Sequence, residues 1–268
     1  MAPATEHTAT LGDQPVFWHS ANGDASPSGG PAPAPVLYLH GVPASSDIWR
    51  PFLERTGGLA PDLPGFGRSG KRGDLDFTID GCARFVDDYL ALVGVERVRL
   101  VVHDWGAAGL VWAQASPERV ERLVIIGAVP LLPGYRWHRI ARAWRARALG
   151  EMAMGATTRW AMGRAMPPAV AAASWPHFDQ GTQRAILRLH RSTPEERLAA
   201  AGAHLARITC PALVVWGDED PFVPPRFADA YAAALGGEAR TERVAGAGHW
   251  PWHEQPDVVD RVARFLAG

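Results

Sequence analysis

Short apolar runs alternate with segments of helical periodicity over most of the chain. The runs are bounded by Gly, Pro or polar residues, as buried strands are, and they lie at residues 36–41, 58–62, 98–102, 122–127, 212–216 and 241–244. Apolar positions recur at helical spacing over residues 78–93, 226–235 and 257–267. This alternation predicts an α/β fold with a mostly parallel central sheet that helices cover on both faces.

The N-terminal region departs from this rhythm. Residues 6–11 and 15–19 predict a short leading hairpin. Residues 21–35, with the sequence ANGDASPSGGPAPAP, are so rich in Gly, Pro and Ser that they predict a loop.

Residues 130–206 interrupt the alternation a second time. Residues 136–147 place Trp and Ile side chains on one helical face and arginines on the others, and four of the chain's five methionines follow by residue 166. We interpret the segment as a helical cap inserted into an α/β core made of residues 1–129 and 207–268. Membrane contact and attraction of anionic substrates are alternative roles for the arginines, and we favour a solvated face of the cap.

Composition and charge exclude several classes of protein. The 268 residues are 47% hydrophobic and 21% charged, as in a globular protein, and the net charge of -1 gives no reason to expect a nucleic acid partner. No apolar run approaches the length of a membrane span, and the first residues lack the basic start of a secretion signal. Cys82 and Cys210 have no metal-ligand spacing, so we expect two buried free thiols and a cytoplasmic location.

The sharpest change from strand to helix occurs at His103-Asp104-Trp105-Gly106, with a carboxylate at the apex. Alone, Asp104 would be interpreted as a helix N-cap. However, the acids Asp218 and Asp220 follow a later predicted strand and His249 follows the last one, and the carboxyl ends of parallel strands gather at one edge of a sheet. The order carboxylate, acid, histidine therefore predicts a nucleophile with its two catalytic partners.

The chemistry of the attacked bond explains a carboxylate at this position. A serine that attacked an sp³ carbon would form an ether, which an activated water cannot readily cleave. An aspartate forms an ester instead, and water can hydrolyse that ester at the carbonyl carbon of the aspartate itself. His249 would deprotonate this water and Asp220 would orient the imidazole, so the substrate should carry an electrophilic carbon with a leaving group.

These residues resemble those of the α/β hydrolases with an aspartate nucleophile, chiefly haloalkane dehalogenases and epoxide hydrolases. The resemblance covers the chain from Val36 to the C-terminus outside the cap. Beside the acid and the histidine, it rests on three motifs: His40-Gly41-Val42-Pro43, Asp62-Leu63-Pro64-Gly65-Phe66-Gly67-Arg68-Ser69 and His103-Asp104-Trp105-Gly106. It implies the α/β-hydrolase fold, with an oxyanion hole made by the backbone N–H groups of Val42 and Trp105.

Two neighbours compete for the catalytic roles. Asp218 is an alternative to Asp220, but the resemblance places the acid three residues after Gly217 and so favours Asp220. His253 is an alternative to His249, but its place beside Glu254 at a helix start is typical of a capping surface residue.

The resemblance leaves the leaving group open. In haloalkane dehalogenases the indole N–H of the residue after the nucleophile binds the halide, and Trp105 matches it. Val42 cannot supply the usual second donor from its side chain, so Trp160 or Trp175 of the cap is the candidate. Epoxide hydrolases use cap tyrosines, and His190 stands where one of them is expected. We rank a dehalogenase slightly above an epoxide hydrolase, and a non-catalytic ligand-binding relative is the third alternative.

No cluster of residues implies a metal or a cofactor. Gly65-Phe-Gly-Arg-Ser-Gly70 has the spacing of a dinucleotide fingerprint, but it does not join a strand to a helix, so we interpret it as a turn. The expected partners are a small apolar substrate and water, and the chain is expected to be a monomer or a homodimer.

Overall fold

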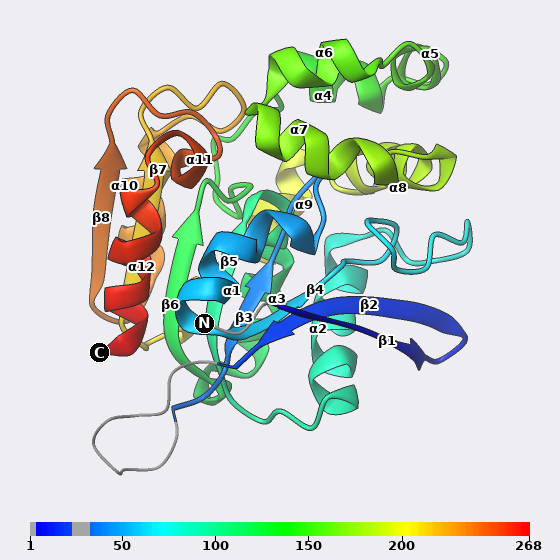
Figure 1. The fold of residues 1–268 in the computed structure, drawn as a ribbon. Helices are drawn as coiled ribbons and strands as arrows, with labels where there is room; N and C mark the ends of the chain where they lie inside the picture. The colour runs from blue at the N-terminus through cyan, green and yellow to red at the C-terminus, as the bar shows by residue number, and fades with distance from the viewer. Residues whose placement is uncertain (1–3, 23–32) are drawn as a thin grey trace.

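A computed structural model describes residues 4–22 and 33–268. The fold is built on one eight-stranded sheet with the strand order β1-β2-β4-β3-β5-β6-β7-β8 (Figure 1). β1 and β2 form an antiparallel hairpin and β2 pairs antiparallel with β4, whereas the remaining strands pair in parallel. The strands are β1 (Thr5–Leu11), β2 (Gln14–Ala21), β3 (Val36–Leu39), β4 (Gly58–Pro61), β5 (Val98–His103), β6 (Val120–Ile126), β7 (Ala212–Gly217) and β8 (Ala239–Val244).

Helices cover both faces of this sheet and add a layer above it (Figure 1). Those packed on the sheet or at its ends are α1 (Arg50–Thr56), α2 (Ile79–Leu92), α3 (Ala108–Ala115), α10 (Arg226–Ala234), α11 (Pro251–Glu254) and α12 (Asp257–Ala267). Those between β6 and β7 are α4 (Arg139–Arg145), α5 (Leu149–Gly155), α6 (Arg159–Ala165), α7 (Pro168–Ser174), α8 (Gln180–Ser192) and α9 (Glu195–Ala201). This architecture is the predicted α/β-hydrolase fold.

The alternation of side chains along the parallel strands divides the core in two. Leu37 and Leu39 of β3 pack on the face covered by α2, α3 and α10, whereas Val36 and Tyr38 pack on the face covered by α1 and α12. Because successive side chains of a strand point to opposite faces, a strand buried on both faces has to be apolar throughout. All four of these side chains are fully buried, which explains the continuous apolar runs in the sequence.

The predicted strands and the leading hairpin are all present, with ends shifted by at most two residues. The predicted loop at 21–35 lies mostly outside the described residues. Helix α1, which the sequence analysis did not identify, begins with Pro51 in its first turn and buries only Phe52 and Leu53. Such a short apolar stripe gives little periodic signal.

The expected burial of both cysteines is half right. Cys82 is buried and Cys210 is only half-buried, and both thiols are free. Over residues 4–22 and 33–268, no helix has the length and apolar character that crossing a membrane requires, and no three potential ligand side chains come together as a metal site would need.

Candidate active site

The turn after β5 holds Asp104 in a conformation that presents its side chain. Asp104 has a φ of 51°, in the left-handed region that residues other than glycine rarely adopt, and it is the first residue of the short 3₁₀ helix Asp104–Ala107. A Cβ on Gly106 would lie 2.1 Å from the Leu39 carbonyl oxygen, and one on Gly41 would lie 2.1 Å from Asp104 Oδ1. The two motif glycines therefore allow the strand-to-helix turn and the carboxylate to fit against β3 and its following loop.

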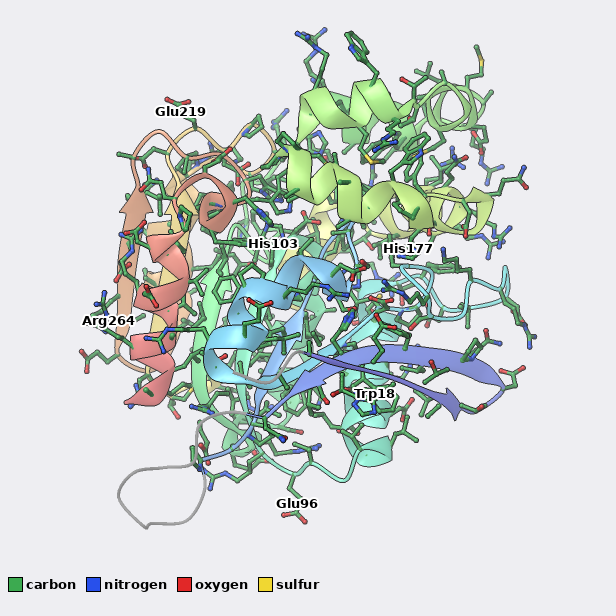
Figure 2. The ribbon with its side chains drawn as sticks, in the orientation of Figure 1. Trp18, Glu96, His103, His177, Glu219 and Arg264 are labelled. Atoms are coloured by element: carbon green, nitrogen blue, oxygen red, sulfur yellow. The ribbon has the colours of Figure 1, made fainter. Side chains whose placement is uncertain are left out.

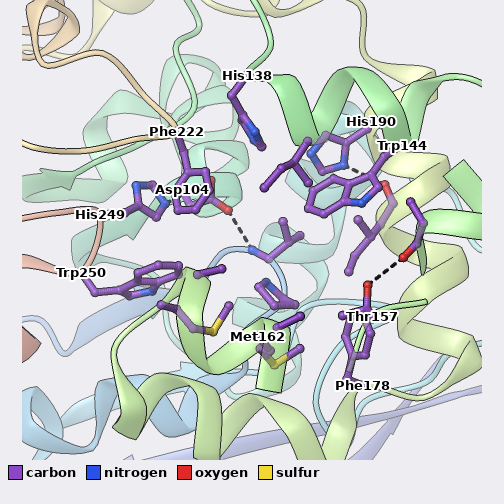
Figure 3. A pocket seen from close by; sticks show the side chains of 18 residues that line it. Asp104, His138, Trp144, Thr157, Met162, Phe178, His190, Phe222, His249 and Trp250 are labelled. Carbon is purple, nitrogen blue, oxygen red and sulfur yellow. Dashed lines mark hydrogen bonds and ion pairs between the residues drawn. The ribbon is translucent and has the colours of Figure 1, made fainter. Parts of the chain in front are cut away.

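The two oxygens of Asp104 have different surroundings. The backbone N–H of Val42 donates to Oδ1 at 2.8 Å, and Oδ2 lies 3.5 Å from His249 Nε2. Among the described residues, the backbone N–H of Trp105 makes no hydrogen bond to this carboxylate. Oδ1 thus occupies the place of an oxyanion, while Oδ2 faces the histidine and the pocket (Figure 3).

Asp220 and His249 form a tight buried pair behind Asp104. His249 Nδ1 donates to Asp220 Oδ2 at 2.7 Å, and the backbone N–H groups of Phe222 and Val223 both donate to Asp220 Oδ1 at 2.9 Å. The neutral His103 donates from Nε2 to the carbonyl oxygen of His249 at 2.9 Å, which fixes the loop that carries the imidazole.

The two competing residues lie elsewhere. Asp218 is exposed and pairs with Arg243 at 3.4 Å. His253 lies in α11, where it lines a different surface cavity together with Asp47 and Arg68.

The charges of the three groups are coupled. Burial alone would raise the pKa of Asp104, but the hydrogen bond and charge of His249 outweigh burial and hold it at about 2. Burial would likewise lower the pKa of His249, but Asp220 and Asp104 outweigh it and raise the pKa to about 10. The resting site therefore holds an imidazolium between two carboxylates.

We expect Asp104→Asn to lower the pKa of His249, because the substitution removes one of the two anions that stabilise the imidazolium. The imidazolium would then lose its proton at a lower pH than in the unmodified protein. NMR titration of the His249 ring measures this directly. Asp218→Asn is the matched control, since that carboxylate lies outside the pair, and an unchanged His249 pKa in Asp104→Asn would contradict the account.

A small apolar cavity opens in front of Asp104 and His249. Its volume of about 230 Å³ lies below the range of about 300–1,000 Å³ that is common for ligand sites. Helices α4, α5, α6 and α8 supply most of its other walls, with Trp144, Met162 and Ile186 among the lining side chains (Figure 3). The cavity fits a small, mainly apolar molecule.

Two histidines add polar atoms to this cavity, and their hydrogen bonds fix opposite tautomers. The Ala141 N–H donates to His138 Nδ1 at 3.3 Å, so the proton of the neutral ring is on Nε2. His190 Nδ1 donates to the Ile186 carbonyl oxygen at 2.8 Å, so Nε2 of that ring carries a lone pair. Burial lowers the pKa of each to about 4, which leaves both rings neutral. Figure 3 shows His138 above Asp104 and His190 beside Trp144.

The cap tryptophans named in the sequence analysis lie away from this cavity. Trp160 is 72% exposed on α6, and Trp175 stacks on Phe178 at 6.0 Å between α7 and α8. Trp105 is buried beside the cavity, edge-on to the lining residue His190 at 5.0 Å and stacked on Trp137 at 5.4 Å. The cap tryptophan that lines the cavity is Trp144, which the sequence analysis assigned only to an apolar helix face.

Comparisons with known proteins agree with this fold. The Alpha/beta hydrolase family matches residues 36–262. A haloalkane dehalogenase of Agrobacterium fabrum is 40% identical to this chain over 101 residues, and the match spans 33% of that protein. A haloalkane dehalogenase of Mycobacterium marinum is 33% identical over 218 residues, which cover 75% of this chain and 72% of that protein. The crystal structure of haloalkane dehalogenase DbeA from Bradyrhizobium elkani has a TM-score of 0.81 and 25% identity, with coverage of 99% of this chain and 98% of that one.

The chain therefore belongs to the α/β-hydrolase family, in a group that includes haloalkane dehalogenases, and it is a hydrolase. The alternative of a non-catalytic relative is not favoured by these similarities.

Proposed function

We propose that the protein is a dehalogenase that hydrolyses small haloalkanes through a covalent ester on Asp104. The observation that carries the proposal is the asymmetry of this carboxylate, with Oδ1 bound by the Val42 N–H and Oδ2 facing an apolar cavity and His249. Similarity to haloalkane dehalogenases over most of the chain supports it.

In the first step, Oδ2 attacks the carbon that bears the halogen. A new C–O bond forms, the carbon–halogen bond breaks, and the halide leaves with the bonding electrons. Since the pKa of Asp104 is about 2, the nucleophile is ionised throughout the neutral range. The apolar walls exclude water, which strengthens the attack by a carboxylate held in a fixed position.

In the second step, His249 becomes a base because the ester has removed one of its two anionic neighbours. Its pKa falls from the resting value of about 10, so the imidazolium first releases its proton to solvent. The neutral Nε2 then takes a proton from water as the oxygen adds to Cγ of Asp104. The negative charge develops on Oδ1, where the Val42 N–H stabilises it. Collapse of this intermediate breaks the Cγ–Oδ2 bond, so Oδ2 leaves with the alkyl group and takes a proton from His249 to become the alcohol. The oxygen of the water stays in the Asp104 carboxyl group, whose proton passes to His249 and restores the resting imidazolium. The balance is haloalkane and water to alcohol, halide and a proton.

The polar atoms of the cavity favour a halide over an epoxide oxygen as the leaving group. An epoxide hydrolase needs an acid that protonates the opening ring, but His190 is neutral and its only proton is bound to the Ile186 carbonyl. A departing halide needs only N–H donors. We assign this role to His138 Nε2–H, with the Trp105 indole as the second donor implied by the resemblance.

Replacing either donor with Phe should slow alkylation, because an N–H aimed at a leaving anion acts mainly in the transition state. We expect losses of about 10²-fold for His138→Phe and for Trp105→Phe, the scale of losing one oxyanion donor. Rapid-quench measurement of halide release over a panel of short bromoalkanes and chloroalkanes gives the rate. Trp160→Phe is the control and should be unchanged, since Trp160 is exposed.

The same panel should include small epoxides. Diol formation without halide release from any haloalkane would contradict the proposed function.

A further inference from the structure

The outer surface of helices α4, α5 and α6 exposes large apolar side chains. Ile140 is 45% exposed, Leu149 52%, Met152 71% and Trp160 72%. In the described part of the chain, these are four of the five large hydrophobic residues that are exposed, and the fifth, Leu92, lies on α2. The three helices form the outermost layer above the sheet (Figure 1), so no other described helix or strand covers this surface, here called the cap surface. Exposed apolar groups gathered in one region mark an interaction site.

The same cap surface is strongly basic. Residues 136–166 contain seven arginines and one acid, Glu151, which pairs with Arg191 at 2.7 Å, although the whole chain has a net charge of -1. Six of the arginines are exposed and have no carboxylate partner within residues 4–22 and 33–268: Arg136, Arg139, Arg142, Arg147, Arg159 and Arg164. Figure 2 shows nitrogen-tipped side chains projecting from this layer.

We propose that the cap surface docks on an anionic lipid bilayer. Arginine together with Trp, Leu and Met on short surface helices is the combination that binds the headgroup region, because the cations attract anionic lipids while the apolar side chains enter the acyl boundary. The guanidinium of Arg164 lies 5.1 Å from the centre of the Trp160 ring, so a cation that attracts anionic lipid and a side chain that enters the acyl boundary lie side by side. A nucleic acid would engage the charge but would leave Leu149 and Met152 in water.

The mouth of the active-site cavity opens within the cap surface. Ile140, Ala161 and Ala165 line the cavity and are also exposed, so the cavity reaches the surface between α4 and α6. Docking would turn this mouth towards the bilayer, where apolar haloalkanes concentrate. That consequence rests on the proposed function, whereas binding to the bilayer does not.

The test is co-sedimentation of the purified protein with vesicles of equal parts phosphatidylglycerol and phosphatidylcholine. We expect binding that weakens as salt is raised, and little binding to vesicles of phosphatidylcholine alone. Replacing Arg139, Arg142, Arg159 and Arg164 with Gln should weaken binding about fivefold for each arginine removed. Trp160→Ser should weaken it with all charges kept.

Matched controls remove the same kinds of group elsewhere. Arg264→Gln, on α12 at the opposite side of the molecule (Figure 2), and Leu92→Ser, on α2, should bind vesicles as the unmodified protein does. Circular dichroism confirms that each variant is folded. Failure to bind the anionic vesicles at low salt would overturn the proposal, and so would loss of binding in the controls equal to that in the cap variants. Binding to homopolymeric RNA without binding to vesicles would overturn it in favour of a nucleic acid partner. None of these measurements requires substrate turnover, so they are independent of the proposed function.

Discussion

His249→Gln should release about one equivalent of halide per active site and then stop. Gln cannot take a proton from water, so hydrolysis of the ester should slow by about 10³-fold or more, as when a triad base is removed. Alkylation should persist, because Asp104 keeps its bond from the Val42 N–H and its place in the cavity. Rapid-quench halide release with enzyme at high concentration shows the burst and the lost turnover.

The matched control is His253→Gln, which removes the competing imidazole. His253 lines a separate surface cavity, so this variant should turn over at the normal rate. Continued turnover in His249→Gln, or a burst without turnover in His253→Gln, would show that the base has been assigned wrongly.

Asp220→Asn should lower the rate of ester hydrolysis by roughly 10³–10⁴-fold, the loss seen when a triad acid is replaced. Asp220 Oδ2 accepts the 2.7 Å bond from His249 Nδ1, and its charge raises the pKa of that histidine. An asparagine would place an amide beside Nδ1 and no longer stabilise the imidazolium that forms as water is deprotonated. Single-turnover kinetics of alcohol release measure the effect.

Asp218→Asn provides the comparison at the neighbouring acid. Its carboxylate is exposed and pairs with Arg243, so we expect a change of less than about tenfold, as for a surface ion pair. If the larger loss occurs in Asp218→Asn, the acid role passes from Asp220 to Asp218.

Much of the fold was predictable because parallel strands buried on both faces leave a strong signal. The mainly apolar strands β3, β5, β6 and β7 have no exposed position, and each ends where the sequence places a Gly, His or Asp. The positions of Asp104, Asp220 and His249 then followed from the common edge at which parallel strands end.

For residues 130–206, the sequence did not predict which side chains face the cavity and which face solvent. A tryptophan gives the same sequence signal whether it points into a cavity, as Trp144 does, or into solvent, as Trp160 does. The sequence alone does not indicate His138 as a donor to the halide. That proposed role depends on which ring nitrogen carries the proton, and the tautomer is set by one N-cap hydrogen bond from the Ala141 N–H. The available signal was its place immediately before the arginine-rich helix, where a residue that accepts from the first turn is expected.

Six of the seven arginines of residues 136–166 are exposed, as expected for a solvated face, and the proposed docking on a bilayer rests on the apolar side chains beside them. The spacing of the arginines alone is typical of a surface helix, but the exposed Leu149, Met152 and Trp160 lie on neighbouring helices that the sequence does not show to be adjacent.

If turnover passes through an ester on Asp104, as we propose, intact-mass spectrometry of His249→Gln after incubation with a short bromoalkane should detect that ester. We expect a mass increase equal to the alkyl group less the one hydrogen that it replaces, in nearly all molecules, and peptide mapping should place this increase on the peptide containing Asp104. An unmodified mass in a sample that has released its equivalent of bromide, or an adduct on any other peptide, would contradict the account.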